Sequence, residues 1–234
     1  MAGFVLTGSG VRGTANDEEP RLVGDTAFTL QPAAINEGAK RLLDFTAAAL
    51  GMLVLLPLFI VVGVLIKLDS RGPVLFSQQR VGRNGVLFRC WKLRSMVQDA
   101  EARKRELLAQ NEMVGGTTFK MKRDPRISRV GRFIRKASID ELPQLWNVLV
   151  GDMSLVGPRP AVPQEVEGYP ARALNRLVVK PGITCIWQVS GRSQIPFEQQ
   201  VEMDIEYAQS RSMRLDLMLL LKTLPAVLFA RGAY

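Results

Sequence analysis

The sequence predicts a mostly helical α+β protein that is attached to a membrane. A run of 22 uncharged, largely apolar residues, 45–66, is long enough as a helix to cross a bilayer core of roughly 30 Å. Two apolar stretches around the turn signal Arg83-Asn84-Gly85 predict a small β-hairpin. Beyond the hairpin, basic and amphipathic segments alternate with turn-rich loops. We therefore expect a membrane helix, a hairpin and a cytoplasmic domain whose amphipathic helices lie at the membrane interface.

Three regions follow from this pattern along the chain. Residues 1–38 show neither helical nor strand periodicity, so we expect a flexible N-terminal tail. Residues 39–68 form the membrane helix, and residues 69–234 form the cytoplasmic, membrane-associated domain. Near the C-terminus an apolar stretch is interrupted by Asp216, Lys222 and Pro225. It predicts an amphipathic helix that either lies at the membrane surface or packs on the core.

The topology of the membrane helix depends on Pro57 and on the flanking charges. Proline lacks an N–H group and crowds the preceding turn, so we expect the helix to be broken at Pro57. Basic side chains flank the apolar run on both sides: Lys40 and Arg41 before it, and Lys67, Arg71 and Arg80 among those after it. The positive-inside rule then keeps both ends in the cytoplasm, which favours a re-entrant helix. A simple span is the alternative.

The charge of the chain calls for an anionic partner. The net charge is +9, and residues 41–234 hold 28 basic and 17 acidic side chains. Nucleic acid, anionic lipid headgroups and phosphorylated substrates are the candidates. The membrane segment favours the last two, and we expect no nucleic-acid partner because no recognised binding module is present.

The chain contains no histidine, which removes the usual neutral-pH base and the commonest metal ligand. Chemistry would therefore fall to carboxylates, lysine and arginine, with a hard ion such as Mg²⁺ if a metal takes part. Cys90 and Cys185 form no ligand cluster. We expect both to be small buried residues in a reducing compartment.

Two adjacent acids, Asp140 and Glu141, follow the most basic part of the chain. Ser138 and Glu141 fit a capping box, in which Ser138 caps a helix and Glu141 reaches back to the N–H of the cap. Pro143 predicts that the start of this helix is distorted. Upstream, arginines recur every third residue, which predicts one basic helix face suited to lipid headgroups or phosphates: Arg126, Arg129, Arg132 and Arg135.

A rigid loop with a single cation follows the acid pair. In Gly157-Pro158-Arg159-Pro160 the prolines restrict the backbone on both sides of Arg159. This restriction lowers the entropy lost when the guanidinium is held toward a ligand. A plain structural turn explains the loop equally well.

Four segments and two later residues carry a resemblance to a known family: RLLDF, GPVLFSQQRVGRNGVLFRCWKLRSM, DPRISRVGRFIRKASIDELPQLWNVLVGDMSLVGPRP and KPGITCIWQVSGR, then Asp204 and Tyr207. On these residues, from about Lys40 to about Phe229, the chain resembles the bacterial sugar transferase family, the monotopic phosphoglycosyl transferases, in its minimal catalytic form. It implies transfer of a sugar 1-phosphate from a UDP-sugar to a polyprenyl (undecaprenyl) phosphate, with release of UMP. This step begins exopolysaccharide or glycoconjugate biosynthesis at the cytoplasmic face of the bacterial inner membrane.

The resemblance also implies roles for individual residues. Asp140 would be the nucleophile that forms an aspartyl-phosphosugar intermediate, and Glu141 would hold Mg²⁺ against the diphosphate. Five further residues match positions in or near the active site: Lys92, Arg135, Arg159, Arg192 and Asp204. The three arginines would clamp phosphates, because a guanidinium grips two oxygens at once. Asp204 would have a supporting role and orient an arginine or the sugar.

Two positions depart from the family pattern. Cys185 stands where relatives usually have glycine, which adds a side chain near the expected nucleotide or sugar pocket. Leu56-Pro57 replaces the frequent Ser-Pro, which removes a hydroxyl that could satisfy a freed carbonyl.

Two other functions stay open: a basic scaffold that binds anionic lipids without catalysis, and an aspartyl-phosphate hydrolase that transfers to water. These motifs do not indicate which sugar is transferred. They also leave open whether the protein forms a homodimer.

Overall fold

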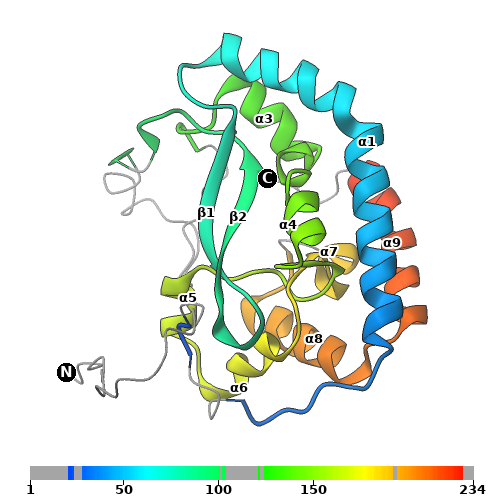
Figure 1. Cartoon of the computed structure of the whole chain (residues 1–234). Helices are drawn as coiled ribbons and strands as arrows, with labels where there is room; N and C mark the ends of the chain where they lie inside the picture. The colour runs from blue at the N-terminus through cyan, green and yellow to red at the C-terminus, as the bar shows by residue number, and fades with distance from the viewer. Residues whose placement is uncertain are drawn as a thin grey trace, which may run out of the picture.

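Helices make up most of the fold, and two small sheets lie among them (Figure 1). The computed structural model describes residues 21–23, 28–100, 102–103, 121, 124–191 and 194–228. The helices are α1 (Glu37–Asp69), α3 (Arg129–Lys136), α4 (Gln144–Val150), α5 (Pro163–Glu167), α6 (Ala171–Leu174), α7 (Ile186–Ser190), α8 (Phe197–Ser210) and α9 (Met213–Leu228). Short 3₁₀ turns are η2 (Arg83–Gly85), η4 (Ile139–Glu141) and η5 (Asn175–Val178). The predicted α+β class is confirmed.

Helix α1 begins where Asn36 accepts a hydrogen bond from the N–H of Ala39 (3.0 Å). Among the described residues it is the one helix whose length and apolar composition would allow it to cross a membrane. Large apolar side chains point outward along it, with Leu53 69% and Val54 73% exposed. A surface of this kind suggests membrane association.

The helix continues through Pro57, so the expected break is not confirmed. In Figure 1 it runs upright at first and then leans across the top of the molecule in its second half. Insertion into one leaflet and return to the same face stays a prediction.

The inward side of α1 packs on two hydrophobic clusters. Ala48 joins Leu145 and Val148 of α4 in the main core. Further along, Val62 and Ile66 pack with residues of the hairpin and of α3 in a second cluster. The helix is therefore attached to the domain along most of its length while its other side stays apolar and exposed.

The predicted hairpin is confirmed. Strands β1 (Leu75–Val81) and β2 (Leu87–Leu93) pair antiparallel, with Val81 opposite Leu87 at the turn. Asn84 and Gly85 both have positive φ angles, 54° and 78°. This conformation explains the Asn-Gly pair, because these two residues tolerate it best.

A second sheet, which the sequence did not predict, consists of β3 (Ser154–Val156) and β4 (Gly182–Thr184) in parallel. A Cβ atom on Gly157 would collide with the carbonyl oxygen of Lys180, and one on Gly182 would collide with the backbone of Gly157. Glycine is therefore required at both positions. Because the two strands approach so closely, the Gly-Pro-Arg-Pro loop lies directly against the loop of residues 180–182.

Residues 28–36 belong to the segment expected to be a flexible tail, yet they contact the folded domain. The N–H groups of Thr29 and Leu30 both donate to Oδ1 of Asn175 at 3.0 Å. The N–H of Ala33 donates to the carbonyl of Ala208 on α8, and the carbonyl of Ala33 accepts from Nε of Arg211. These bonds hold the approach to α1 in an extended conformation.

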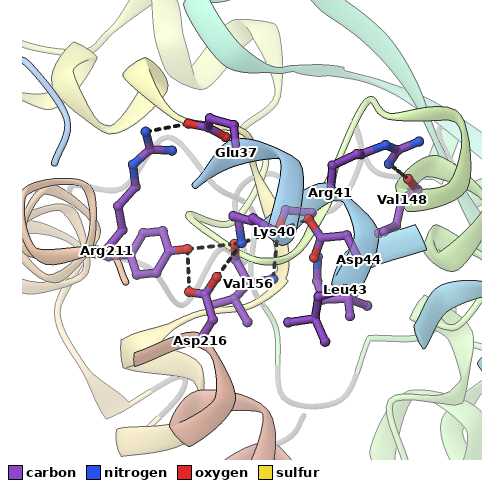
Figure 2. A network of polar contacts seen from close by, with 12 residues as sticks. Glu37, Lys40, Arg41, Leu43, Asp44, Val148, Val156, Arg211 and Asp216 are labelled. Atoms are coloured by element: carbon purple, nitrogen blue, oxygen red, sulfur yellow. Dashed lines mark hydrogen bonds and ion pairs between the residues drawn. The ribbon is translucent and has the colours of Figure 1, made fainter. Parts of the chain in front are cut away.

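A buried polar network joins the first turns of α1 to the domain (Figure 2). Nζ of Lys40 lies 2.5 Å from Oδ2 of Asp216 on α9, and both side chains are less than a tenth exposed. The Tyr207 hydroxyl lies 2.8 Å from the other oxygen of Asp216 and 3.0 Å from the carbonyl of Val156. Asp44 accepts the N–H of Leu155 at 3.0 Å, which ties α1 to β3.

Arg41 extends this network to α4. Its guanidinium donates to the carbonyls of Val148 (2.5 Å) and Leu149 (2.6 Å). These carbonyls belong to the last turn of α4, where helical partners are missing, so Arg41 caps that helix. The first turns of α1 therefore fix α4, β3 and α9 together.

Helix α9 confirms the core-packing alternative for the C-terminal segment, and its contact with a membrane surface stays a prediction. Leu219 is only 2% exposed and packs in the main core. Four other apolar side chains point outward and are 41–69% exposed: Leu217, Met218, Leu221 and Leu224. One side of the helix thus packs in the core, and the other side is apolar and exposed.

Replacing Lys40 by methionine should strongly destabilise the fold, because Asp216 would stay buried without its counter-charge. Removing one partner of a buried ion pair costs about 3–5 kcal/mol. The unfolding midpoint in detergent micelles, followed by circular dichroism, should fall markedly.

The double variant Lys40→Met/Asp216→Leu should recover most of this loss, since Tyr207 keeps the carbonyl of Val156 as an acceptor. Arg103→Met is the control, because it breaks the exposed pair with Asp99 and should have little effect. A double variant no more stable than Lys40→Met would contradict this reading of the pair.

Candidate active site

A small pocket lies between the hairpin, the turn η4 and the loops next to β3 and β4. Its polar lining consists of three cations, one carboxylate and two amides: Arg80, Lys92, Arg159, Glu141, Gln144 and Gln188. The excess of positive charge suits an anionic ligand such as a phosphate.

The hairpin register places two of these cations. Arg80 on β1 is opposite Phe88, and Lys92 on β2 is opposite Phe76. Because alternate residues of a strand share a face, Arg80 and Lys92 point to the same side of the hairpin. Arg80 was not identified as a site residue from the sequence. The predicted hairpin would have placed Arg80 on the same face as Lys92, which was identified as a site residue.

Arg80 also supports the Gly-Pro-Arg-Pro loop. One of its terminal nitrogens donates to the carbonyl of Pro160 at 2.9 Å. Burial, followed by the neighbouring charge of Arg159, lowers the pKa of this guanidinium. Two arginines held this close together favour a ligand that supplies negative charge.

The acid pair lies in a tight 3₁₀ turn. Ser138 adopts a left-handed conformation (φ 55°, ψ 19°) and makes no capping hydrogen bond, so the predicted capping box is wrong. An N-cap needs an extended backbone, and Glu141 is drawn to cations elsewhere. The predicted distortion is confirmed, because α4 begins only after Pro143. Left-handed geometry at a residue other than glycine is uncommon and often occurs at functional sites.

Glu141 is held by two of the pocket cations. Its Oε1 lies 2.7 Å from Nζ of Lys92 and 3.3 Å from Nη2 of Arg159. Burial alone would raise the pKa of Glu141, but the charges of Lys92 and then Arg159 outweigh it and hold the pKa well below its ordinary value. Glu141 is therefore ionised at neutral pH.

Asp140 is 9% exposed and lies buried beside the pocket rather than in its lining. Burial and the charge of Glu141 raise its pKa to about 6, against the opposing influence of Lys92, Arg135 and Arg159. Asp140 is thus mostly a carboxylate at neutral pH, though a poorly solvated one. Adjacent carboxyls with opposite pKa shifts are typical of sites in which each has its own task.

The arginines upstream do not form the single helix face that their spacing predicted. Helix α3 begins at Arg129, after the cap Ser128. Arg126 precedes the helix and is buried, with Nη2 2.6 Å from Oδ2 of Asp124. Arg126 does not join a helix face because it forms a buried ion pair with Asp124, two residues earlier. Arg135, half-buried in the last turn of α3, is close enough to lower the pKa of Asp140.

Asp204 acts on the site through another residue. It is fully buried on α8 and forms an ion pair with Arg176. Arg176 in turn donates to the carbonyl of Arg159 (3.4 Å) and to the hydroxyl of Tyr169 (3.0 Å). Burial raises the pKa of Asp204 to about 6, although Arg176 counteracts it. Asp204 therefore pairs with an arginine that contacts the Gly-Pro-Arg-Pro loop, while its role at the site stays a prediction. No sequence spacing pointed to Arg176.

The structure thus brings Asp140, Glu141, Lys92 and Arg159 together, with Arg135 nearby and Asp204 behind them. Arg192 lies outside the described residues.

The acid pair can accommodate one divalent cation but no all-protein metal cage. Among the described residues no group of three or more acidic, cysteine or histidine side chains could hold a metal. Mg²⁺ often binds through one or two carboxylates and takes its other ligands from water and substrate phosphates. Both contacts of Glu141 go to Oε1, which leaves Oε2 as the oxygen for a cation. The donor set therefore fits Mg²⁺ in company with a diphosphate.

The buried charge of Asp140 predicts that Asp140→Asn is more stable than the wild type at pH 7.5. Because the folded pKa of about 6 lies above the ordinary 3.8, ionisation costs stability as pH rises through this interval. The cost is on the order of 2–3 kcal/mol above pH 6 and vanishes below about pH 4. Unfolding midpoints at pH 7.5 and 4.5 measure it.

Asp152→Asn, outside the pocket lining, is the matched control and should show no such gain. A lower midpoint for Asp140→Asn at pH 7.5, or a difference independent of pH, would contradict this account of Asp140.

Comparisons with known proteins identify the sequences that this chain resembles. The galactosyl transferase CpsE of Streptococcus agalactiae is 50% identical over 196 residues, which are 83% of this chain and 43% of that protein. The undecaprenyl-phosphate galactose phosphotransferase of Salmonella typhimurium is 44% identical over 198 residues, 83% of this chain and 41% of that protein. The exopolysaccharide production protein ExoY of Rhizobium meliloti is 37% identical over 224 residues, 94% of this chain and 98% of that protein.

The chain thus spans about two fifths of the first two relatives and nearly all of the third. Several relatives are named as undecaprenyl-phosphate sugar phosphotransferases, and their names specify galactose, glucose or N-acetylgalactosamine. These names support a transferase without fixing the sugar. Residues 35–230 match the family described as bacterial sugar transferase, and the chain belongs to that family.

Proposed function

We propose that the protein transfers a sugar 1-phosphate from a UDP-sugar to undecaprenyl phosphate or a related polyprenyl phosphate and releases UMP. The observation that carries this proposal is the buried Asp140 carboxyl next to Glu141, which two pocket cations hold ionised. The names of the relatives support the acceptor and the sugar donor. The reaction would begin the synthesis of an exopolysaccharide or glycoconjugate.

In the first step the Asp140 carboxylate attacks the β-phosphorus of the UDP-sugar. The bond between this phosphorus and the bridging oxygen breaks, and UMP leaves with that oxygen. The product is an acyl phosphate that carries the sugar. Repulsion between carboxylate and diphosphate is the main obstacle, and Lys92, Arg159 and Arg80 supply the compensating charge.

In the second step a phosphate oxygen of the polyprenyl phosphate attacks the same phosphorus. The bond to Asp140 breaks, which restores the carboxylate and gives a polyprenyl-diphosphate sugar. The acceptor is a lipid, so the pocket must lie close to the bilayer. The exposed apolar sides of α1 and α9 support attachment to a membrane. The proposed reaction takes place at the cytoplasmic face of the inner membrane.

Glu141 would hold Mg²⁺ through Oε2 while Lys92 and Arg159 keep its other oxygen in place. The bound ion would supply positive charge to the diphosphate. Asp204 would keep Arg159 aligned through Arg176, because the latter donates to the carbonyl of Arg159. Arg135 would add charge at the start of the acid turn.

The variant Asp140→Asn should lose UMP release by roughly a thousandfold or more, because an amide cannot form the acyl phosphate. The assay uses purified protein in detergent with Mg²⁺, undecaprenyl phosphate and a panel of UDP-sugars. Asp152→Asn carries the same chemical change outside the pocket lining and should keep normal turnover.

The outcomes separate the competing functions. Normal UMP release by Asp140→Asn would overturn the nucleophile assignment. Free sugar phosphate in place of lipid-linked sugar from the wild type would indicate a hydrolase. A wild type that releases no UMP from any donor would indicate a membrane scaffold.

A further inference from the structure

Part of the pocket wall is uncharged and is formed by two glutamines. Gln144, the first residue of α4, is only 3% exposed and lines the pocket. Within the described part of the chain, no hydrogen bond satisfies its side-chain amide. An amide that faces a pocket without a protein partner is available to hydrogen-bond a ligand. Gln188 on α7 lines the same pocket.

Gln188 is held in one orientation by Cys185. The thiol of Cys185 donates to Oε1 of Gln188 at 3.1 Å. Cys185 is fully buried, and burial raises the pKa of its thiol well above the ordinary value, so that it keeps its proton. Because the carbonyl end of Gln188 is engaged, its NH₂ group is the end that remains for a ligand. Cys185, which departs from the family pattern, therefore contacts a residue that lines the pocket.

The position of Gln144 indicates which part of a UDP-sugar it would meet. Gln144 follows Glu141 by three residues and lines the pocket with it, so it lies close to the acid pair. In the proposed reaction the β-phosphorus reacts at that pair, and the sugar is bonded directly to this phosphorus. The uridine is one phosphate further away. Sugar hydroxyls both donate and accept hydrogen bonds, and amides do the same.

We infer that Gln144 and Gln188 recognise the sugar hydroxyls of the donor and that Cys185 is a positioning residue that sets the amide of Gln188. This inference rests on the proposed function and makes it more specific. A pocket that hydrogen-bonds a hydroxyl discriminates strongly against a donor that places the hydroxyl elsewhere. Replacing Cys185 therefore weakens the preference for one sugar over another and leaves the chemical step intact.

The test measures kcat and KM for UDP-glucose, UDP-galactose and their two N-acetylamino counterparts with undecaprenyl phosphate as acceptor. Cys185→Ala removes the thiol donor and should raise KM for the preferred donor about tenfold, with kcat nearly unchanged. The preference between the 4-epimers should shrink accordingly. Cys185→Ser is the matched control, since its hydroxyl can still donate to Gln188 and should preserve the preference.

Gln188→Ala provides a second route to the same result if Cys185→Ala does not fold, and it should show the same loss of preference. Inhibition by UMP should be unchanged in all these variants, because UMP carries no sugar at the β-position.

An equal change in KM for every donor, together with weaker inhibition by UMP, would show that the amides contact the nucleotide and would overturn the inference. Unchanged preferences in Gln188→Ala would also overturn it. Failure of the proposed function is distinguishable, since the wild type would then release no UMP from any donor.

Discussion

The buried ion pair between Lys40 and Asp216 is the interaction on which the rest of the structure depends. It fixes the first turns of α1 against α9, and the neighbouring Asp44 and Arg41 bind β3 and the end of α4. Helix α4 begins directly after the acid turn, and β3 leads directly into the Gly-Pro-Arg-Pro loop. The element that suggests membrane association is therefore the one that holds both halves of the pocket, so attachment and site geometry are set together.

The surrounding charges shift the pKa values of the two adjacent carboxyls in opposite directions. Lys92 and Arg159 stabilise the charge of Glu141, whereas Asp140 is buried and shares its surroundings with that charge. A carboxylate that is poorly stabilised in the free protein is a stronger nucleophile, and the compensating cations are already in position. In the proposed mechanism, the loss of stability at Asp140 serves this purpose, as is common at active sites. Arg176, which is paired with Asp204, donates a hydrogen bond to the carbonyl of Arg159 and so helps to position that residue.

The sequence predicted those parts of the fold that have strong local signals. The apolar run, the Asn-Gly turn and the effect of Pro143 identified α1, the hairpin and the distorted start of α4. It misjudged the capping box, because the left-handed Ser138 and the cations that attract Glu141 belong to tertiary structure. Strands of three residues, such as β3 and β4, are too short for a periodic pattern. The pair of Arg176 with Asp204 joins segments that only the fold brings together. The Cys185–Gln188 contact is local, but only the fold shows that it lies at the pocket.

The central claim is that Asp140 becomes covalently bonded to the phosphorus of the donor. Intact-protein and peptide mass spectrometry after incubation with UDP-sugar, without a lipid acceptor, tests it most directly. The account predicts a mass increase of one sugar phosphate on the peptide that contains Asp140, and loss of this adduct when undecaprenyl phosphate is added. Formation of lipid-linked sugar with no adduct at any stage, or an adduct on another residue, would contradict it.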